Sequence, residues 1–251
     1  MEAWLQRGYG VRFDWGPEGA RRLAPGSAYA VVVDVLSFTT SVSVLVDAGT
    51  RVHPRGWQDG ANPAGVPVAV GRSAVTADQP WSLSPAALRR APAPADLVLP
   101  SPNGSAIAAA IKDHCDLVAG SLRNARAVGR WLRHHDVGTP DRPLTVIAAG
   151  ERWPDGTLRP ALEDLLGAGA IIDALDAAAT QSPEARTAAH AYRAAAGDLR
   201  RTIMDSASGR ELAAIGFAED VAIALETNTS AIVPVLRDGA FSAAAPGSDG
   251  D

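Results

Sequence analysis

AYAVVVDVL, residues 28–36, is a nearly continuous apolar run of strand length. Its three consecutive valines, Val31 to Val33, favour a β-strand. A strand without a polar face is typical of burial on both sides, so we expect it in the middle of a sheet. Ser37, Thr39 and Thr40 follow at once as candidate caps for a helix that ends near Gly49.

The same alternation of strand-length apolar runs and longer helical segments continues along the chain and is typical of an α/β fold. Further strands are predicted at Arg51–His53, Pro67–Val70, Leu97–Leu99, Leu117–Ala119, Leu144–Ala148 and Ile232–Leu236. Helices are predicted at Ser105–Lys112, Ala125–His134, Ala161–Ala178, Pro183–Met204, Gly209–Ile215 and Glu219–Leu225, and a loop at Gly56–Ala64. We therefore expect a three-layer α/β/α sandwich with a largely parallel or mixed central sheet.

No linker longer than a turn separates these segments, which predicts a single domain over residues 1–251. Its core is expected at about 27–236, and the Ala- and Pro-containing stretch 243–251 is expected to be a disordered tail.

Composition narrows the function further. The 251 residues carry 23 basic and 28 acidic side chains, a net charge of −5, and 47% of them are hydrophobic. The hydrophobic fraction excludes a disordered chain, and no apolar run approaches the ~20 residues needed to cross a bilayer. The net negative charge argues against a nucleic-acid-binding protein, because the sequence has no cluster of basic residues that could bind phosphates. With a single cysteine, Cys115, and no signal-like start, we expect a cytoplasmic protein, and a homodimer as the commonest assembly.

Polar residues gather where predicted strands end, which is where open α/β sheets bind their ligands. Asp34 ends the first core strand, and Glu151 follows the strand at 144–148, with Glu163-Asp164 just beyond it. Two loops, Ser101–Ser105 and Ser121–Asn124, each connect a strand to a helix. Helix N-termini present free N–H groups to anions, and Gly104 would let the backbone approach a phosphate closely.

Four carboxylates at these positions, Asp34, Glu151, Glu163 and Asp164, are hard oxygen ligands that could converge on Mg²⁺. Structural roles compete with this interpretation. Asp34, Ser121 and Asn124 could act only as helix caps, and Ser101–Gly104 only as a tight turn. Glu163 and Asp164 could simply complement a helix dipole.

Seven parts of the chain carry a family pattern, in order over about residues 27–236: 32–40, 101–106, 119–125, 149–151 with 162–169, 206–212, 219–221 and 233–234. Together they resemble the 2-phosphosulfolactate phosphatases. The resemblance implies a three-layer α/β/α fold, Mg²⁺ dependence and hydrolysis of the phosphate ester of a small acid. In that family the substrate carries both a phosphate and a sulfonate and belongs to the route to coenzyme M.

The chain departs from the family pattern at three places. Val70-Gly71-Arg72 stands where the family usually reads Gly-Glu-Arg, so an expected carboxylate is absent. Ser37 stands in place of an arginine, and Ser101–Ser105 in place of Thr-Thr-Asn-Gly-Thr. The first change motivates an alternative function, a non-catalytic small-anion-binding protein of the same fold.

The leading hypothesis is Mg²⁺-dependent hydrolysis of a small phosphorylated acid. Asp34, Glu151 and Glu163 are the expected catalytic residues, and with Asp164 they form the expected metal site. Arg123, Arg152 or Arg210 could bind the second anionic group. The expected substrate-binding residues are Ser37, Thr39, Thr40, Ser101, Asn103, Gly104, Ser105, Ser121, Arg123, Asn124, Arg152 and Arg210. A variant hypothesis makes Asp34 a covalent nucleophile, although such sites place a second acid where this chain has Leu36.

Overall fold

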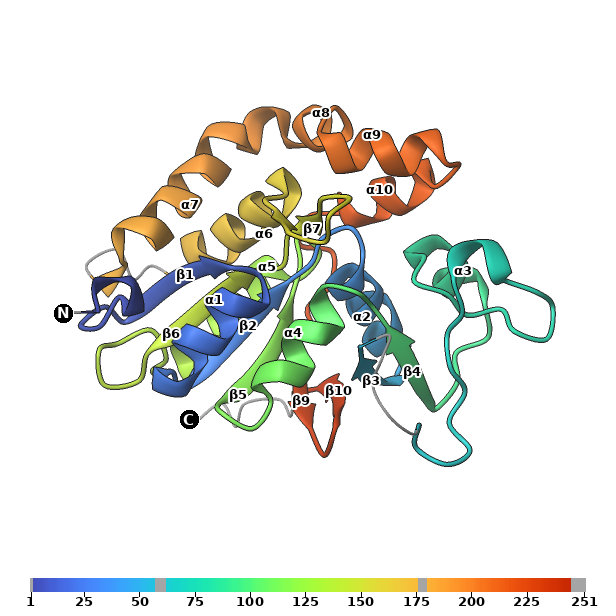
Figure 1. Ribbon diagram of the computed structural model, residues 1–251, viewed down its shortest axis with the longest axis horizontal. Coiled ribbons are helices and arrows are strands. Elements are labelled where there is room, and N and C mark those ends of the chain that lie inside the picture. Colours follow the sequence, from blue (N-terminus) through green and yellow to red (C-terminus); the bar gives the residue numbers. More distant parts are fainter. Residues whose placement is uncertain (1, 57–61, 176–179, 245–251) are drawn as a thin grey trace.

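A single sheet of eight strands organises the part of the chain that the computed structural model describes, residues 2–56, 62–175 and 180–244 (Figure 1). Across the sheet its strands are β1 (Val11–Trp15), β6 (Leu144–Ala148), β2 (Tyr29–Val33), β5 (Asp116–Gly120), β9 (Pro234–Arg237), β10 (Ala240–Ala243), β3 (Arg51–Arg55) and β4 (Asp96–Pro100). β1, β6, β2 and β5 are parallel to one another. The hairpin β9–β10 then pairs antiparallel with β5 on one side and β3 on the other, and β3 is parallel to β4.

Strand β2 lies between β6 and β5, with Val31 opposite Val146 and Val118. All five of its residues are buried. Successive side chains of a strand point to opposite faces, so Val31 and Val33 belong to one apolar cluster and Val32 to the other. The central strand that the apolar run predicts is therefore confirmed, as is the mixed sheet.

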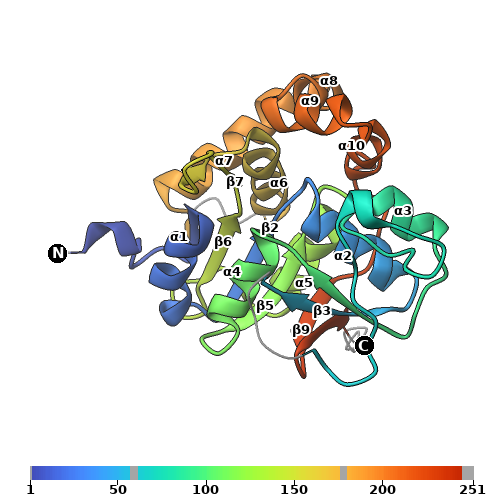
Figure 2. The same ribbon diagram turned by 45° about the vertical axis from the view of Figure 1, so that its right-hand side comes forward.

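Helices cover both faces of the sheet (Figures 1 and 2). The cluster containing Val32 also includes apolar residues of α1 (Gly16–Leu23), α2 (Phe38–Asp47) and α4 (Gly104–Ile111). The opposite cluster includes residues of α5 (Ala125–His134), α6 (Leu162–Asp173) and α7 (Pro183–Ala195). This arrangement confirms the three layers of an α/β/α fold.

The described residues contain four further α-helices: α3 (Pro85–Arg90), α8 (Leu199–Met204), α9 (Ala207–Ala214) and α10 (Ala218–Ala224). The hydroxyls of Ser84 and Ser206 accept hydrogen bonds from backbone N–H groups in the first turns of α3 and α9. In Figure 2, α8, α9 and α10 follow α7 along the top of the molecule. A small hairpin of β7 (Glu151–Arg152) and β8 (Leu158–Arg159) directly follows β6.

Several boundaries differ from the sequence prediction. The core does not begin at residue 27, because β1 and α1 precede it and Val11 and Phe13 are buried. The segment Pro183–Met204 is not one helix: a 3₁₀ turn at Ala196–Asp198 separates α7 from α8. Pro67–Val70 forms only isolated bridges rather than a strand. Ala243 belongs to β10 instead of a disordered tail.

Parts of three predicted segments lie outside the described residues. These parts are residues 57–61 of the loop, 176–178 of the helix predicted at Ala161–Ala178, and 245–251 of the tail. Among the helices of the described residues, none is long and apolar enough to cross a membrane.

Candidate active site

Asp34 lies directly after β2, between the first turns of two helices. Its carboxylate accepts hydrogen bonds from the N–H of Phe38, at 3.1 Å, and from the N–H of Gly104, at 2.8 Å. The Ser101 hydroxyl lies 3.5 Å from the same oxygen that Gly104 contacts. Burial raises the pKa of Asp34 above its ordinary value, and the two amide hydrogen bonds oppose that rise. The helix N-termini thus bind a carboxylate of the protein itself.

Gly104 is required for this close approach. A Cβ at this position would lie 2.8 Å from Asp34 Oδ2 and closer still to the Phe38 ring. The sequence predicts that the absence of a Cβ serves a phosphate, whereas in the structure the N–H of Gly104 binds the Asp34 carboxylate.

Two glutamates lie close enough to Asp34 for its charge to raise their pKa values. Glu151 begins β7, and the Asn103 amide donates a hydrogen bond to it at 3.1 Å. Burial first, and then the charges of Asp34 and Glu163, raise the pKa of Glu151 to about 7. Glu163, in the first turn of α6, is almost fully buried, and its pKa is also raised, chiefly by burial. The three carboxyl groups, of which Asp34 and Glu163 are buried and Glu151 is half-buried, form a cluster of like charge.

Asp164 has a different environment from these three acids. One of its oxygens accepts the N–H of Val35, at 2.7 Å, and the other accepts the N–H of Gly150, at 2.8 Å. These bonds connect the loop after β2 to the loop after β6. Burial, with the charges of Asp34 and Glu163, raises the pKa of Asp164 well above its ordinary value. Its contacts are those of a positioning residue.

Two arginines that the sequence analysis does not assign to the site supply its positive charge. Arg72 donates to the Ser37 hydroxyl at 2.7 Å and forms an ion pair with the fully buried Asp220 at 3.3 Å. Its guanidinium lies 5.5 Å from the centroid of the Phe217 ring. Arg159, at the end of β8, forms a two-pronged ion pair with Glu211 at 2.7 and 2.6 Å.

Two adjacent cavities lie at Glu151 and share Leu36, Arg72 and Glu151, whereas Glu163 lines neither of them. The smaller, about 260 Å³, is also lined by Asp34, Ser37, Val70, Gly71, Leu83, Ser101, Pro102 and Asn103. The larger, about 510 Å³, is also lined by Arg152, Trp153, Pro154, Arg159, Ser208, Glu211, Leu212 and Ile215. A small acid with two anionic ends could therefore occupy both.

The structure brings six of the sequence-predicted site residues to these cavities: Asp34, Ser37, Ser101, Asn103, Glu151 and Arg152. Three other predicted hydroxyls are fully buried and bond to backbone carbonyls instead. Thr39, Thr40 and Ser105 donate to the carbonyls of residues 34, 35 and 99, respectively. These three stabilise the loops that carry the site.

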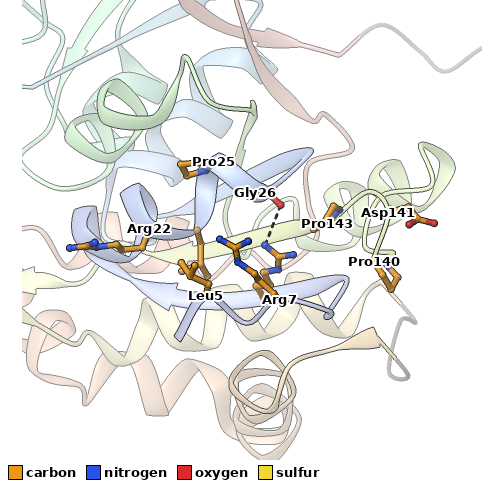
Figure 3. Close-up of a pocket in the computed structure, with 10 residues that line it drawn as sticks. Leu5, Arg7, Arg22, Pro25, Gly26, Pro140, Asp141 and Pro143 are labelled. Atoms are coloured by element: carbon orange, nitrogen blue, oxygen red, sulfur yellow. Dashed lines mark hydrogen bonds between the residues drawn. The ribbon is translucent and has the colours of Figure 1, made fainter. Parts of the chain in front are cut away.

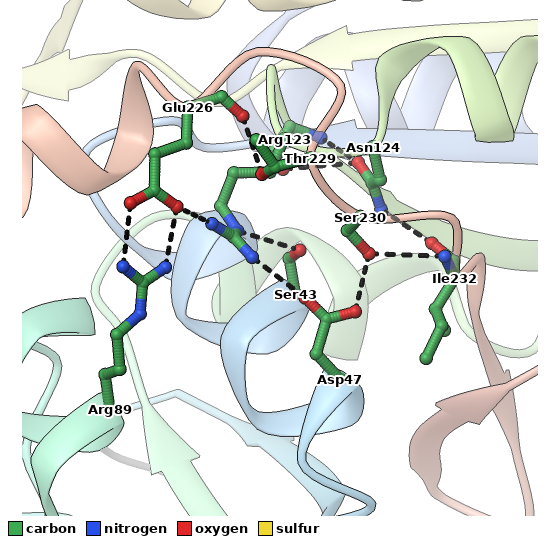
Figure 4. A network of polar contacts seen from close by, with 10 residues as sticks. Ser43, Asp47, Arg89, Arg123, Asn124, Glu226, Thr229, Ser230 and Ile232 are labelled. Carbon is green, nitrogen blue, oxygen red and sulfur yellow. Dashed lines mark hydrogen bonds and ion pairs between the residues drawn. The ribbon is translucent and has the colours of Figure 1, made fainter.

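The loop Ser121–Asn124 lies in a separate polar network (Figure 4). Arg123 forms ion pairs with Asp47, at 2.8 Å, and with Glu226. The Asn124 amide oxygen accepts the N–H of Ser121. The two cavities beside Glu151 are not lined by Ser121, Arg123 or Asn124. Arg210, which is exposed on α9, does not line them either.

The donor chemistry of the acid cluster fits Mg²⁺. Asp34 and Glu163 are buried and Glu151 is half-buried; all three are oxygen donors whose charges repel one another, and a divalent cation would relieve that repulsion. No group of three or more acid, histidine or cysteine side chains is preassembled around an ion position in the described part of the chain. Mg²⁺ usually takes only one or two protein carboxylates and completes its shell with water and substrate oxygens, so a smaller set suffices.

Comparison with known proteins identifies the family. A model of the 2-phosphosulpholactate phosphatase family matches residues 76–239. A 2-phosphosulfolactate phosphatase of Methanothermobacter thermautotrophicus is 34% identical over 143 residues, 57% of each chain. A protein of Pseudothermotoga lettingae named "Probable 2-phosphosulfolactate phosphatase" is 29% identical over 152 residues, 60% of this chain and 62% of that protein.

The matched part thus spans about six-tenths of the length of these two curated relatives. The family match includes Asn103, Glu151, Arg159 and Glu163 but begins after Asp34, which reaches the same site through β2. Because the family match covers well over half of the sequence, the chain belongs to the 2-phosphosulfolactate phosphatase family.

Proposed function

We propose that the protein is a Mg²⁺-dependent phosphatase that hydrolyses the phosphate ester of a small acid, of the kind that its relatives' names describe. The observation that carries this proposal is the smaller cavity. It combines two carboxyl groups, the buried Asp34 and the half-buried Glu151, with the Arg72 guanidinium and the Ser37 hydroxyl. An acid pair for the cation next to donors for phosphoryl oxygens is what phosphate-ester hydrolysis requires.

Asp34 and Glu151, with Glu163 behind them, would hold the cation, which supplies charge neutralisation to the phosphoryl oxygens when bound. Arg72, Ser37 and the Asn103 amide would bind and orient the phosphoryl group. Hydrolysis breaks the ester P–O bond as a water oxygen bonds to phosphorus, and the departing alcohol gains a proton. A carboxylate of the site would accept the proton of that water.

The larger cavity would hold the second anionic group of the substrate. Arg159 is the best-placed residue for it, because its guanidinium is kept in place by Glu211 and lines the cavity beside Glu151. A sulfonated substrate on the route to coenzyme M follows from the family and is part of the proposal. A cytoplasmic location and a homodimer remain predictions.

The decisive experiment measures phosphate release from 2-phosphosulfolactate and from an aryl phosphate, with Mg²⁺ or with EDTA. We expect Mg²⁺-dependent release that Asp34→Asn abolishes. The exposed Asp205→Asn serves as the matched control and should keep the wild-type rate. No release from either ester by the wild type, together with tight phosphate binding, would favour the non-catalytic alternative. Release insensitive to EDTA, with an acyl-phosphate trapped on Asp34, would favour the nucleophile variant.

The substrate's second anion is tested separately with Arg159→Gln. We expect KM for 2-phosphosulfolactate to rise about tenfold, the size of one lost charge-assisted contact, with little change for the aryl phosphate. Arg210→Gln, which lies outside both cavities, should change neither value. An equal effect of Arg159→Gln on both substrates would contradict the assignment.

A further inference from the structure

Figure 3 shows residues that line a third cavity, of about 450 Å³. Its walls include the segment before β1, the 3₁₀ turn Ala24–Gly26 before β2 and the turn before β6. These three strands are parallel neighbours, so their starts share one edge of the sheet. Asp34 and Glu151 follow the ends of β2 and β6, and a five-residue strand spans roughly 16 Å. The cavity is therefore separate from the candidate active site.

Arg12 is the central residue of this cavity. It is only 6% exposed, and its Nε and Nη1 donate to the carbonyls of Tyr9 and Gly26, both at 3.2 Å. Both acceptors are neutral, and among the described residues no carboxylate forms an ion pair with Arg12. A guanidinium has five N–H donors, so the Nη2 group still has hydrogens to donate. A buried charge without a counterion is costly, which makes this arrangement unusual.

A second arginine adds to the positive charge instead of neutralising it. Figure 3 shows the Arg7 side chain beside the guanidinium that bonds to Gly26. Burial and the charge of Arg7 together lower the pKa of Arg12. Within the described part of the chain, the ion-pair partner of Arg7 is the exposed Glu2 at 3.9 Å, and a surface pair of this kind contributes little.

The remaining charged residues of the wall do not cancel the two arginines. Arg22 also lines the cavity but bonds to Glu18 at 2.8 Å. Asp141 is exposed, and in Figure 3 its carboxylate points away from Arg7. The interior of the cavity is thus bordered by two guanidinium groups that lack an acidic partner inside it.

We propose that this cavity is a second anion site, which binds a phosphate group through Arg12 and Arg7. Guanidinium groups bind phosphate through paired N–H donors, and a dianion would supply the counter-charge that Arg12 lacks. The volume lies in the range of small-molecule sites, so the cavity has room for a small phosphate ester as well as for the free ion.

The experiment measures binding of inorganic phosphate by equilibrium dialysis at constant ionic strength. An Arg72→Gln background weakens binding at the candidate active site, so that the second site dominates. In this background we expect about one phosphate per chain. Adding Arg12→Gln should weaken binding about tenfold or more, and adding Arg7→Gln severalfold. The matched control is Arg21→Gln, because Arg21 contacts Glu18 on the same helix but lies outside the cavity; it should change binding less than twofold.

Arg7 is exposed, so its replacement tests the proposal even where loss of Arg12 prevents folding. Absence of phosphate binding in the Arg72→Gln background would overturn the proposal, as would equal binding in the Arg7→Gln and Arg21→Gln variants. Phenylphosphonate, whose P–C bond resists hydrolysis, distinguishes the two sources of phosphate. Tighter binding of phenylphosphonate assigns the site to a phosphate ester, and tighter binding of phosphate assigns it to the free ion.

Discussion

Glu151 is the site carboxyl group whose pKa lies close to neutral pH in the folded protein. In the unfolded chain this carboxyl group ionises near its ordinary value of 4.5, whereas in the folded protein burial, Asp34 and Glu163 raise its pKa to about 7. Between these two values the folded protein binds the proton more tightly than the unfolded chain does. Its contribution to stability is therefore complete below pH 4.5 and is lost as the pH rises towards 7.

We expect the metal-free protein to lose stability between pH 5 and pH 8, and Glu151→Gln to remove about 2–3 kcal/mol of that loss. Urea unfolding in EDTA at the two pH values measures it. Glu219→Gln, at an exposed position, is the control and should leave the pH dependence as it is. A pH dependence unchanged by Glu151→Gln would show that its carboxyl group ionises normally.

Residue chemistry could be predicted where a polar side chain directly follows a buried strand. Asp34 and Glu151 are predicted in this way, because the ends of parallel strands share one edge of a sheet, and the structure places both beside one cavity. Arg72 and Arg159 were not found, since their partners Asp220 and Glu211 lie 148 and 52 residues away and only the fold brings them together. Arg123 also follows a strand and is predicted to bind substrate, but its guanidinium forms ion pairs with Asp47 and Glu226.

At the scale of elements, the loops after β2 and β6 depend on Asp164. Asp164→Ala would leave the N–H groups of Val35 and Gly150 without acceptors in a buried position, at a cost of about 2–4 kcal/mol. Chemical denaturation measures this loss, and kcat/KM should fall with it because both loops carry site residues. Asp173→Ala on the same helix removes only an exposed pair with Arg193 and should cost less than about 1 kcal/mol. Equal losses for the two variants would contradict this role.

The start of α4 packs against Asp34 without space for a side chain. Gly104→Ala should destabilise the protein by about 1–3 kcal/mol and reduce turnover, because the new methyl group displaces Phe38 or the Asp34 carboxylate. The control is Gly197→Ala, in the 3₁₀ turn between α7 and α8, where a Cβ meets open space. It should be neutral or stabilise by up to about 1 kcal/mol. Thermal and urea unfolding compare the two variants.

Element prediction succeeded for long apolar or strongly periodic segments and failed for short ones. The segment 28–36 carries one charge in nine residues. This pattern alone predicts that β2 lies inside the sheet, as it does. Residues 11–15, Val-Arg-Phe-Asp-Trp, carry two charges in five residues, so β1 was missed although it pairs with β6 along its whole length. The 3₁₀ turn at Ala196–Asp198 contains Gly197, the local signal that could have divided the predicted helix Pro183–Met204.

At the scale of the whole molecule, the acid cluster makes stability depend on the proposed cation. Mg²⁺ at about a hundred times its dissociation constant should stabilise the protein by about 2.7 kcal/mol and raise Tm by roughly 5–10 °C. Differential scanning calorimetry with MgCl₂, and with NaCl of matched ionic strength, measures the shift. EDTA should reverse it, and Asp34→Asn should largely abolish it. The same shift with NaCl would mean that general screening, not a bound ion, stabilises the fold.

The position of β2 also has a consequence for how the chain is made. Residues 29–33 leave the ribosome long before their neighbours, since β5 ends at residue 120 and β6 at residue 148. At about 5–20 residues per second, roughly 6–20 seconds of translation separate the most apolar strand from its second partner. During that interval its valines are exposed, and chaperones or the same strand of a neighbouring nascent chain can bind them.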